Sequence, residues 1–597
     1  MSLAPESRVM LTDALRPPAE FRVDAAVGTT YTLDLTALLL APLAFAVADR
    51  AHTTGGDDSG IDPIRLLEAV RRHADRTTIF VQAGGIAVPS NYRSMLTFIE
   101  DSVREVAPPA HARIFHPKIW ALRFIDAAGG YQHRVVILSR NLTFDRSWDT
   151  ALVLDESPDG TIDAEPAASF IRELPSLGLR ALDSDRQALI DDLSTTLAAV
   201  RLQPPTPFTE GRLLPIGLTD QPVWPFPARA DRLLAISPFL TPPAVAGMAR
   251  ISGERTLVSR AESFDLIGST ALDGWSIRTL QRLAEGASDA DTAIEATRAP
   301  HDGLHAKTFV LDLDGGTSTT VTGSANMTSA QWGKSVEFDA VLTGPTHDCG
   351  VERVLDDDGL AAVLGAYTPQ SESGAEAPTI ATEKLIEQFQ LALAASHPVL
   401  QVDAATDGLV TLTLVIDPPP DPGMSRVWPA SVSATQARPS SDPLVWTIAA
   451  KNVTPFLAVE TTAGQGESRV TTRCVIMAEL TGDVGDRRAA ALHDVLSSPL
   501  DVLRYLVFLL GDPSYDDLVA ASATAAVGYG EFGPAASTSV TLFEPLVRAL
   551  GRDTDALARV ANLVDELRAM PNGAALIPES FDELWDAVWR VHQEVSA

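Results

Sequence analysis

Short apolar runs alternate with amphipathic stretches along roughly the first 365 residues of the chain. Buried strands are expected at 77–81 and 232–237, where aliphatic and β-branched residues follow one another with few polar interruptions. Helices are expected where apolar residues recur every three or four positions, at 63–74, 95–106, 185–202, 242–250 and 277–287. Alternating strands and helices are typical of a layered α/β fold.

Two strand pairs in this region share one design. The first is expected at 112–125 and 133–138, and the second at 305–313 and 319–322. Strands and helices precede each pair in a similar order, and a proline-rich linker lies between the two units at 204–207. The pattern predicts a duplication with halves at 1–205 and 206–370.

The remaining sequence has a different character. Residues 371–482 combine a linker helix with short Val- and Thr-rich alternating runs, which predicts an antiparallel β-rich domain. Residues 483–597 contain amphipathic stretches and are expected to form a helical domain, in which Trp585 and Trp589 pack one turn apart. These two regions are expected to regulate the rest of the chain or to dock a protein partner.

Composition limits the classes of function. A formal charge of −32 argues against a surface coated broadly for nucleic acid but permits a local basic groove. The two cysteines, Cys349 and Cys474, have no metal-ligand spacing and predict neither a disulfide framework nor a zinc site. The apolar run at 37–48 is too short to span a bilayer. A cytoplasmic protein without a membrane span is expected.

Lysine usage identifies the candidate chemistry. The chain has only five lysines, and two of them, Lys118 and Lys307, stand two residues after a histidine. The histidines are His116 and His305, and each motif is followed by a serine and an asparagine: Ser139 and Asn141 in the first copy, Ser324 and Asn326 in the second. Such a doubled motif in a lysine-poor chain requires a mechanism that uses it twice.

The residue types suit a phosphate group. Lysine supplies a point charge with three donors, serine and asparagine supply neutral donors, and imidazole attacks phosphorus or transfers a proton near neutral pH. Two copies that meet would place histidines on opposite sides of one phosphorus, as in-line displacement requires. The lysines and asparagines would neutralise the equatorial oxygens, so neither a metal nor a cofactor is expected.

These segments resemble the phospholipase D superfamily, whose members carry two HxKxxxxD…GSxN motifs. The second copy is complete, with Asp312, Gly323 and the later acid Glu337. The first departs from the pattern, because Arg123 replaces the aspartate and Leu138 replaces the glycine; Asp149 is the candidate for its later acid.

The resemblance implies a fold and a division of roles. It implies a mixed β-sheet sandwiched by helices in each half, with the active site between the halves. It also implies that His116 attacks phosphorus and that His305 performs acid/base chemistry.

The substrate is less determined by the sequence. The segment 111–148 is a basic island, for which a nucleic-acid backbone is the natural partner; its cations are Arg113, Lys118, Arg123, Arg134, Arg140 and Arg146. A metal-independent nuclease on DNA or RNA, in bacterial defence or nucleic-acid processing, is therefore the first hypothesis. A phospholipase or transphosphatidylase and a non-catalytic phosphate-binding scaffold are the alternatives. Trp120 and Trp332 lie near the motifs, where core packing competes with stacking on a ligand.

Overall fold

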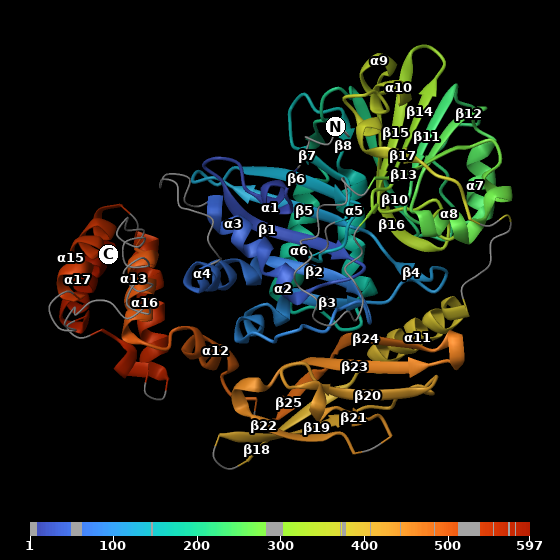
Figure 1. Ribbon diagram of the computed structural model, residues 1–597. Helices are drawn as coiled ribbons and strands as arrows, with labels where there is room; N and C mark the ends of the chain where they lie inside the picture. The colour runs from blue at the N-terminus through green and yellow to red at the C-terminus, as the bar shows by residue number, and fades with distance from the viewer. Residues whose placement is uncertain are drawn as a thin grey trace, which may run out of the picture.

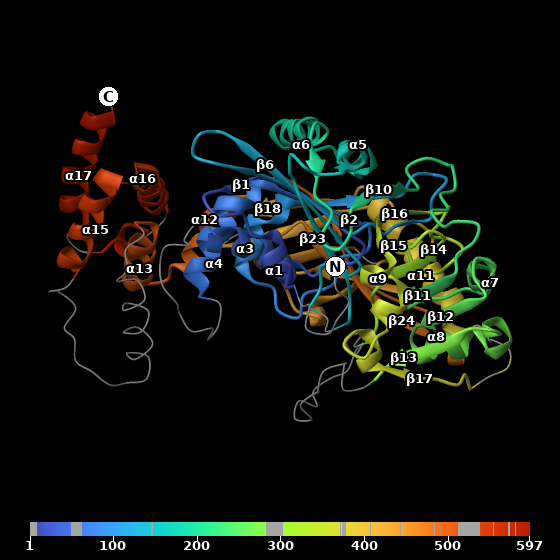
Figure 2. The same cartoon turned by 90° about the horizontal axis from the view of Figure 1, so that it is seen from above.

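A computed structural model of the 597-residue chain places two β-sheets with their helices side by side, followed by a β-rich region and a group of helices (Figure 1). It describes residues 9–48, 62–144, 147–281, 303–370, 372, 378–405, 408–441, 443–482, 484–510, 538–552, 554–570, 573–578 and 581–596. Viewed from above, the C-terminal helices lie beside the first half, on the side away from the second half (Figure 2).

The first half is built on a six-stranded sheet. Its strand order is β3 (Val103–Val106), β2 (Thr77–Gln82), β1 (Arg22–Thr30), β5 (Ile119–Ile125), β6 (Tyr131–Leu138) and β7 (Ala151–Asp155). The first three strands are parallel to one another, and the remaining pairings are antiparallel.

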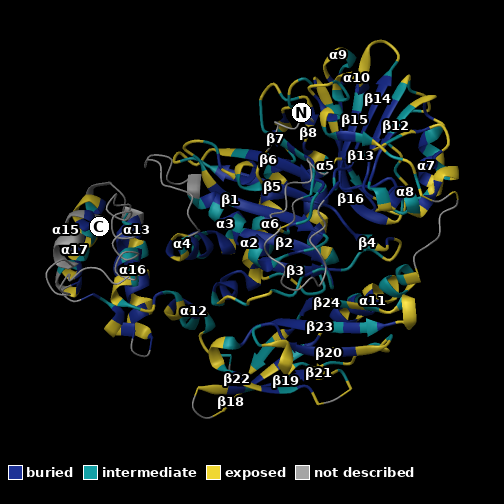
Figure 3. Ribbon diagram, in the orientation of Figure 1, coloured by how far each residue is buried: buried dark blue, intermediate teal, exposed yellow. Residues whose placement is uncertain are grey.

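Side chains of β5 alternate between two cores, so both faces of this sheet are covered. Trp120, Leu122 and Phe124 pack in the core that contains the helices before β2, whereas Ile119 and Ala121 pack in the core that contains those after β7. The first face is covered by α2 (Leu35–Leu38), α3 (Leu40–Ala48) and α4 (Pro63–His73), and the second by α5 (Glu165–Glu173) and α6 (Ser184–Leu197). The sheets are accordingly buried and the outer helix faces exposed (Figure 3).

The second half repeats this plan. Its order is β13 (Ser276–Leu280), β12 (Glu254–Val258), β11 (Arg232–Ile236), β14 (Thr308–Leu313), β15 (Thr317–Gly323) and β16 (Ser335–Pro345), with the same parallel and antiparallel pairings. The outer strands β10 (Glu210–Ile216) and β17 (Leu364–Ala366) extend it. Helices α7 (Pro242–Ala249) and α8 (Ala261–Ile267) cover one face, and α10 (Val351–Val354) lies on the other. The α/β class and the duplicated sandwich halves are confirmed.

Three local predictions were wrong. The helix expected at 95–106 is two 3₁₀ turns followed by β3, and the helix expected at 277–287 begins with β13, with 282–287 outside the described residues. The strand expected at 112–125 is divided, since β4 (Ile114–Phe115) ends before the motif histidine and β5 begins after the lysine. Both missed strands are the third parallel strand of their half and are short; β3 is largely buried, whereas β13 is partly exposed.

The C-terminal regions are β-rich and then helical, as expected, but the pairing of 399–402 with 479–482 is parallel and not antiparallel. Helix α11 (Pro378–Ala395) precedes two four-stranded sheets that share one core; their strands are β18 (Val399–Ala404), β19 (Leu409–Val415), β20 (Met424–Pro429), β21 (Arg438–Pro439), β22 (Val445–Ala449), β23 (Phe456–Ala463), β24 (Val470–Met477) and β25 (Glu479–Gly482). The helices that follow are α12 (Arg487–Val495), α13 (Pro499–Leu509), α15 (Thr538–Arg552), α16 (Thr554–Ala569) and α17 (Phe581–Ser596). The stack of Trp585 on Trp589 is confirmed, with ring centroids 5.1 Å apart. Within the described ranges, no helix is both long and apolar enough to cross a bilayer.

Candidate active site

The two motifs meet where each half contacts the other in the same way. Strand β4 pairs in parallel with the start of β16, and the backbone N–H of His116 donates to Val336 O at 2.9 Å. Reciprocally, the N–H of His305 donates to Trp148 O at 2.7 Å. Val336 and Trp148 each precede the acid of their half, Glu337 or Asp149. Each histidine segment therefore lies beside the acid-bearing segment of the opposite half.

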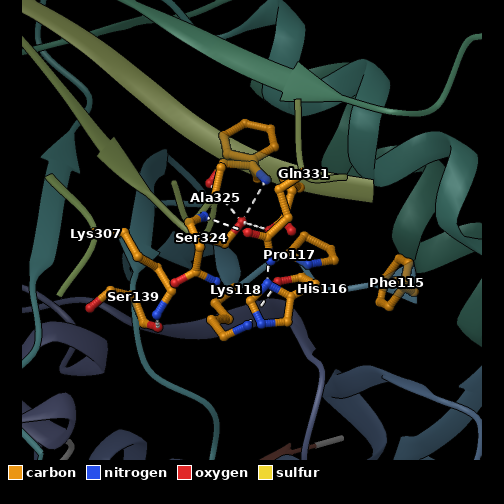
Figure 4. Close-up of polar contacts among 12 residues, drawn as sticks. Phe115, His116, Pro117, Lys118, Ser139, Lys307, Ser324, Ala325 and Gln331 are labelled. Carbon is orange, nitrogen blue, oxygen red and sulfur yellow. Dashed lines mark hydrogen bonds and ion pairs between the residues drawn. The ribbon is translucent and has the colours of Figure 1, made fainter. Parts of the chain in front are cut away.

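The two lysines are anchored by equivalent hydrogen bonds. Lys118 Nζ donates to His116 O at 2.8 Å, and Lys307 Nζ donates to His305 O at 2.7 Å. Lys307 also reaches across the interface to Ser139 O at 3.2 Å, as Figure 4 shows. Both lysines are completely buried, so their backbone acceptors hold them in place without neutralising their charge.

The two serines orient the site. Ser139 Oγ accepts from Thr150 N at 2.8 Å, and Ser324 Oγ accepts from Phe338 N at 2.9 Å. The hydroxyl of Ser324 donates to Glu337. These serines are fully buried, and their hydrogen bonds tie the turn after one strand to the next strand.

The side-chain oxygen of each motif asparagine is buried and has no hydrogen-bond partner in the described part of the chain. These atoms are Asn141 Oδ1 and Asn326 Oδ1. A buried polar atom without a partner is costly unless a ligand engages it. The asparagines therefore differ from the serines, whose hydroxyl groups already have partners.

Glu337 fixes the ring of His116. The Nδ1 atom of His116 lies 2.9 Å from Glu337 Oε2, and the Tyr31 ring packs against the imidazole with centroids 5.2 Å apart. A carboxylate at Nδ1 favours the tautomer that carries its proton there and leaves a lone pair on Nε2. Burial, followed by the charges of Lys118 and Lys307, lowers the pKa of His116 well below 6.5, so the imidazole is neutral.

Burial also perturbs the charged groups around the histidines. It lowers the pKa of Lys118 to about 7, against the opposing attraction of Glu337, and it lowers the pKa of Lys307 well below 10.5. It raises the pKa of Glu337 and of Asp339 to about 7. Burial and the neighbouring lysines likewise lower the pKa of His305. Clustered perturbed groups of this kind are typical of functional sites.

Two buried residues of this site were missed in the sequence. Asp339 accepts hydrogen bonds from Ser324 N at 2.7 Å and Ala325 N at 3.1 Å, so it fixes the turn of the second motif. Gln331 Oε1 accepts from Asn326 N at 2.7 Å. Period-two alternation places Asp339 on the same face of β16 as Glu337, and this was the available signal.

The arginine in the first motif has its own partners. Asp312 of the second motif accepts from Ser318 Oγ at 2.7 Å and from Val351 N at 3.0 Å at the start of α10. Arg123, at the corresponding position, pairs with Asp24 at 2.6 Å and with Asp192 of α6 at 2.7 Å. Both residues hold a helix against the sheet, with opposite charge.

Leucine in place of the motif glycine is also compensated. A Cβ on Gly323 would lie 2.2 Å from Asp339 Oδ1. Gly323 pairs with Asp339 on the next strand, and at the equivalent position of the first half Leu138 pairs with Ala151. The first half therefore has a small residue where the second has an acid. The same register equates Asp149 with Glu337, and Asp149 Oδ2 lies 3.5 Å from Arg140 Nη1.

The basic island does not form one surface. Arg123 and Arg134 occupy opposite faces of the first sheet, and Arg134 pairs with Asp155 at 2.6 Å. Lys118 is buried in the site, and Arg146 lies outside the described residues. Arg113 remains exposed, and its backbone N–H donates to the carbonyl of exposed Lys334 at 2.7 Å. Trp120 and Trp332 are buried core residues.

Other candidate ligands are few. No group of three or more His, Cys, Asp or Glu side chains that could hold a metal ion occurs in the part of the chain that the structure describes. Away from the motifs, the buried His133 pairs with the partly exposed Glu156 at 2.7 Å.

Comparison with known proteins gives matches of fold only. No family model and no curated protein matches the sequence. Among solved structures, yeast tyrosyl-DNA phosphodiesterase is 12% identical, with 59% of this chain and 89% of that chain covered and a TM-score of 0.33. Phosphatidylserine synthase of Haemophilus influenzae Rd KW20 is 10% identical, with 64% and 90% covered and a TM-score of 0.30.

Both TM-scores are below 0.5, so the resemblance to the phospholipase D superfamily rests on the motifs and the internal duplication of this chain. The two halves share strand order and strand direction, and both place a histidine and a lysine before the fourth strand. Their turns also share hydrogen bonds: Leu142 N donates to Thr30 Oγ1, and Met327 N donates to Ser237 Oγ. In its motifs and in the arrangement of its duplicated halves, this chain resembles the phospholipase D superfamily.

Proposed function

We propose that this protein is a phosphodiesterase that forms a phosphohistidine intermediate without a metal ion. The observation that carries the proposal is the reciprocal contact between the halves, which brings two histidines and two buried lysines to one interface. Buried cations without a paired carboxylate are costly, and an anionic substrate between them would offset that cost.

In the first step, His116 Nε2 attacks phosphorus and the bond to the leaving oxygen breaks. Glu337 stabilises the positive charge that develops on the ring, through its contact with Nδ1. His305 donates a proton to the leaving oxygen. An approaching phosphate raises the lowered pKa of His305, because its negative charge favours the protonated imidazole.

In the second step, the same groups act in reverse. His305, now neutral, removes a proton from water, and the oxygen of that water forms a bond to phosphorus while the P–N bond to His116 breaks. Lys118 and Lys307 stabilise the charge on the equatorial oxygens throughout. The Asn141 and Asn326 carboxamides supply the neutral contacts, since their buried oxygens mark unfilled positions and either amide can rotate to donate.

For the substrate, we favour a nucleic-acid phosphodiester. Arg113 and Lys334 are exposed, adjacent through a backbone hydrogen bond, and each lies three residues from His116 or Glu337, about 10 Å along a strand. They form a cationic pair at the junction of the halves that would contact a phosphate backbone beyond the scissile group. This support is narrower than the basic island expected from the sequence.

The test uses labelled single- and double-stranded DNA and RNA, with and without EDTA. We expect cleavage that is unaffected by EDTA, and a labelled protein band after acid-free denaturing quench. His116→Ala should abolish the band and cleavage, and His133→Asn is the matched control with a buried histidine outside the site. Choline release from phosphatidylcholine without nucleic-acid cleavage would instead support the lipid alternative, and binding of phosphate without any turnover would support the scaffold alternative.

A further inference from the structure

The two halves differ at one position beside the site. Gln82, the last residue of β2, accepts a hydrogen bond at Oε1 from the N–H of Phe115 at 2.7 Å. Arg260, the corresponding residue after β12, donates from Nε to Leu304 O at 2.7 Å. Phe115 and Leu304 each precede the motif histidine. The second half therefore places a cation beside its histidine where the first half has a neutral amide.

Arg260 also holds an aromatic ring at the surface. Its guanidinium carbon lies 5.2 Å from the ring centroid of Phe239, and this phenyl ring is 46% exposed. The position of Phe239 is fixed: its carbonyl accepts from Ser237 Oγ at 2.8 Å, and the next residue, Leu240, bridges to Met327 directly after Asn326. The exposed ring is thus held by the turn of the second motif and by an arginine that is bonded to the residue before His305.

We propose that Phe239, supported by Arg260, is the stacking surface for the nucleobase of the leaving nucleotide. This inference rests on the proposed function, in which His305 protonates the leaving oxygen. A base has a π-face that stacks on phenylalanine regardless of sequence, and Arg260 adds positive charge for the attached phosphate. An acyl-glycerol group has no planar ring, so this surface favours a nucleotide over a lipid.

Two ligands that differ only in the base test the proposal. Thymidine 5′-phosphate and 2-deoxyribose 5-phosphate share sugar and phosphate, and their binding to the full chain is measured by titration calorimetry. We expect about tenfold tighter binding of the thymidine compound, the lower end of what stacking contributes. Phe239→Leu should remove this preference and leave the affinity for deoxyribose 5-phosphate unchanged. Arg260→Gln, which installs the residue of the first half, should weaken the binding of both ligands.

Tyr131 provides the matched control. Its ring is 44% exposed and lies under the guanidinium of Arg123, 4.3 Å from the centroid, at the far end of β6 from the motif. Tyr131→Leu should leave the base preference intact. Equal affinity of the wild-type protein for the two ligands overturns this inference alone, as does a preference that survives in Phe239→Leu. Failure of the wild-type protein to bind either phosphate counts against the proposed function as well.

Discussion

The contact between His116 and Glu337 makes a prediction that separates catalysis from folding. In Glu337→Gln the side chain keeps its shape, but its amide donates to Nδ1 of His116 and stabilises the tautomer with the proton on Nε2. That nitrogen then has no lone pair for attack. Loss of the correct tautomer in a comparable acid–histidine pair lowers kcat by about 10⁴, so we expect at least a thousandfold fall, or about 4 kcal/mol of transition-state stabilisation.

The same substitution should leave the fold stable. Burial raises the pKa of Glu337 from 4.5 to about 7, so keeping the ionised carboxylate buried costs about 3 kcal/mol above pH 7. This cost is absent below pH 4.5 and grows as the pH rises to about 7. Glutamine does not ionise, which offsets the weaker hydrogen bonds to His116 and Ser324. We therefore expect the unfolding midpoint at pH 8 to stay within a few degrees of the wild type.

The assay is steady-state hydrolysis of bis(p-nitrophenyl) phosphate, together with thermal unfolding at pH 5 and pH 8. Glu156→Gln is the matched control, because Glu156 contacts Nδ1 of the buried His133 in the same way but outside the site. That variant should keep the wild-type kcat. Wild-type kcat in Glu337→Gln, or equal loss in both variants, would refute the reasoning.

The remaining predictions concern charge and packing. Burial lowers the pKa of Lys118 to about 7, so the protein should lose affinity for inorganic phosphate as the pH rises through 7. Titration calorimetry from pH 5.5 to 8.5 measures this affinity, and a constant value up to pH 8.5 would contradict the prediction. Arg123→Met leaves Asp24 without its buried cation. We expect urea titration to show a free energy of unfolding that is lower by about 3 kcal/mol. The kcat should not change, because Arg123 lies about 20 Å along the chain from His116. Gly323→Leu should prevent stable folding, because the new side chain displaces Asp339. Adding Asp339→Ala copies the Leu138–Ala151 pair and should restore a cooperative unfolding transition. Failure of the double variant to fold would show that the paired positions are not interchangeable.

The sequence predicted the duplication and the layered class, because these depend on local patterns that repeat; the roles of the motif residues stay predictions. It did not predict β3 and β13, since they are short and the apolar spacing around them also fits a helix. Asp339 and Arg260 were missed for another reason. Alternation along β16 places Asp339 beside Glu337, but the roles of Asp339 and Arg260 depend on which strand lies beside which, and a single sequence does not specify that long-range pairing. The same limit explains why the cations of the island 111–148 looked like one surface, although the pleat places Arg123 and Arg134 on opposite faces.

Gly323 pairs with Asp339, and Leu138 pairs with Ala151. The two residues of each pair are expected to change together in evolution. A lineage that replaces the glycine must lose the acid at the same time, because either change alone creates a clash or leaves the turn without its acceptor. Related chains should therefore covary at these positions: glycine opposite an acid, or a large aliphatic residue opposite a small one. Intermediate combinations should be rare in both halves, and an aligned family would reveal this coupling as a coordinated exchange across neighbouring strands.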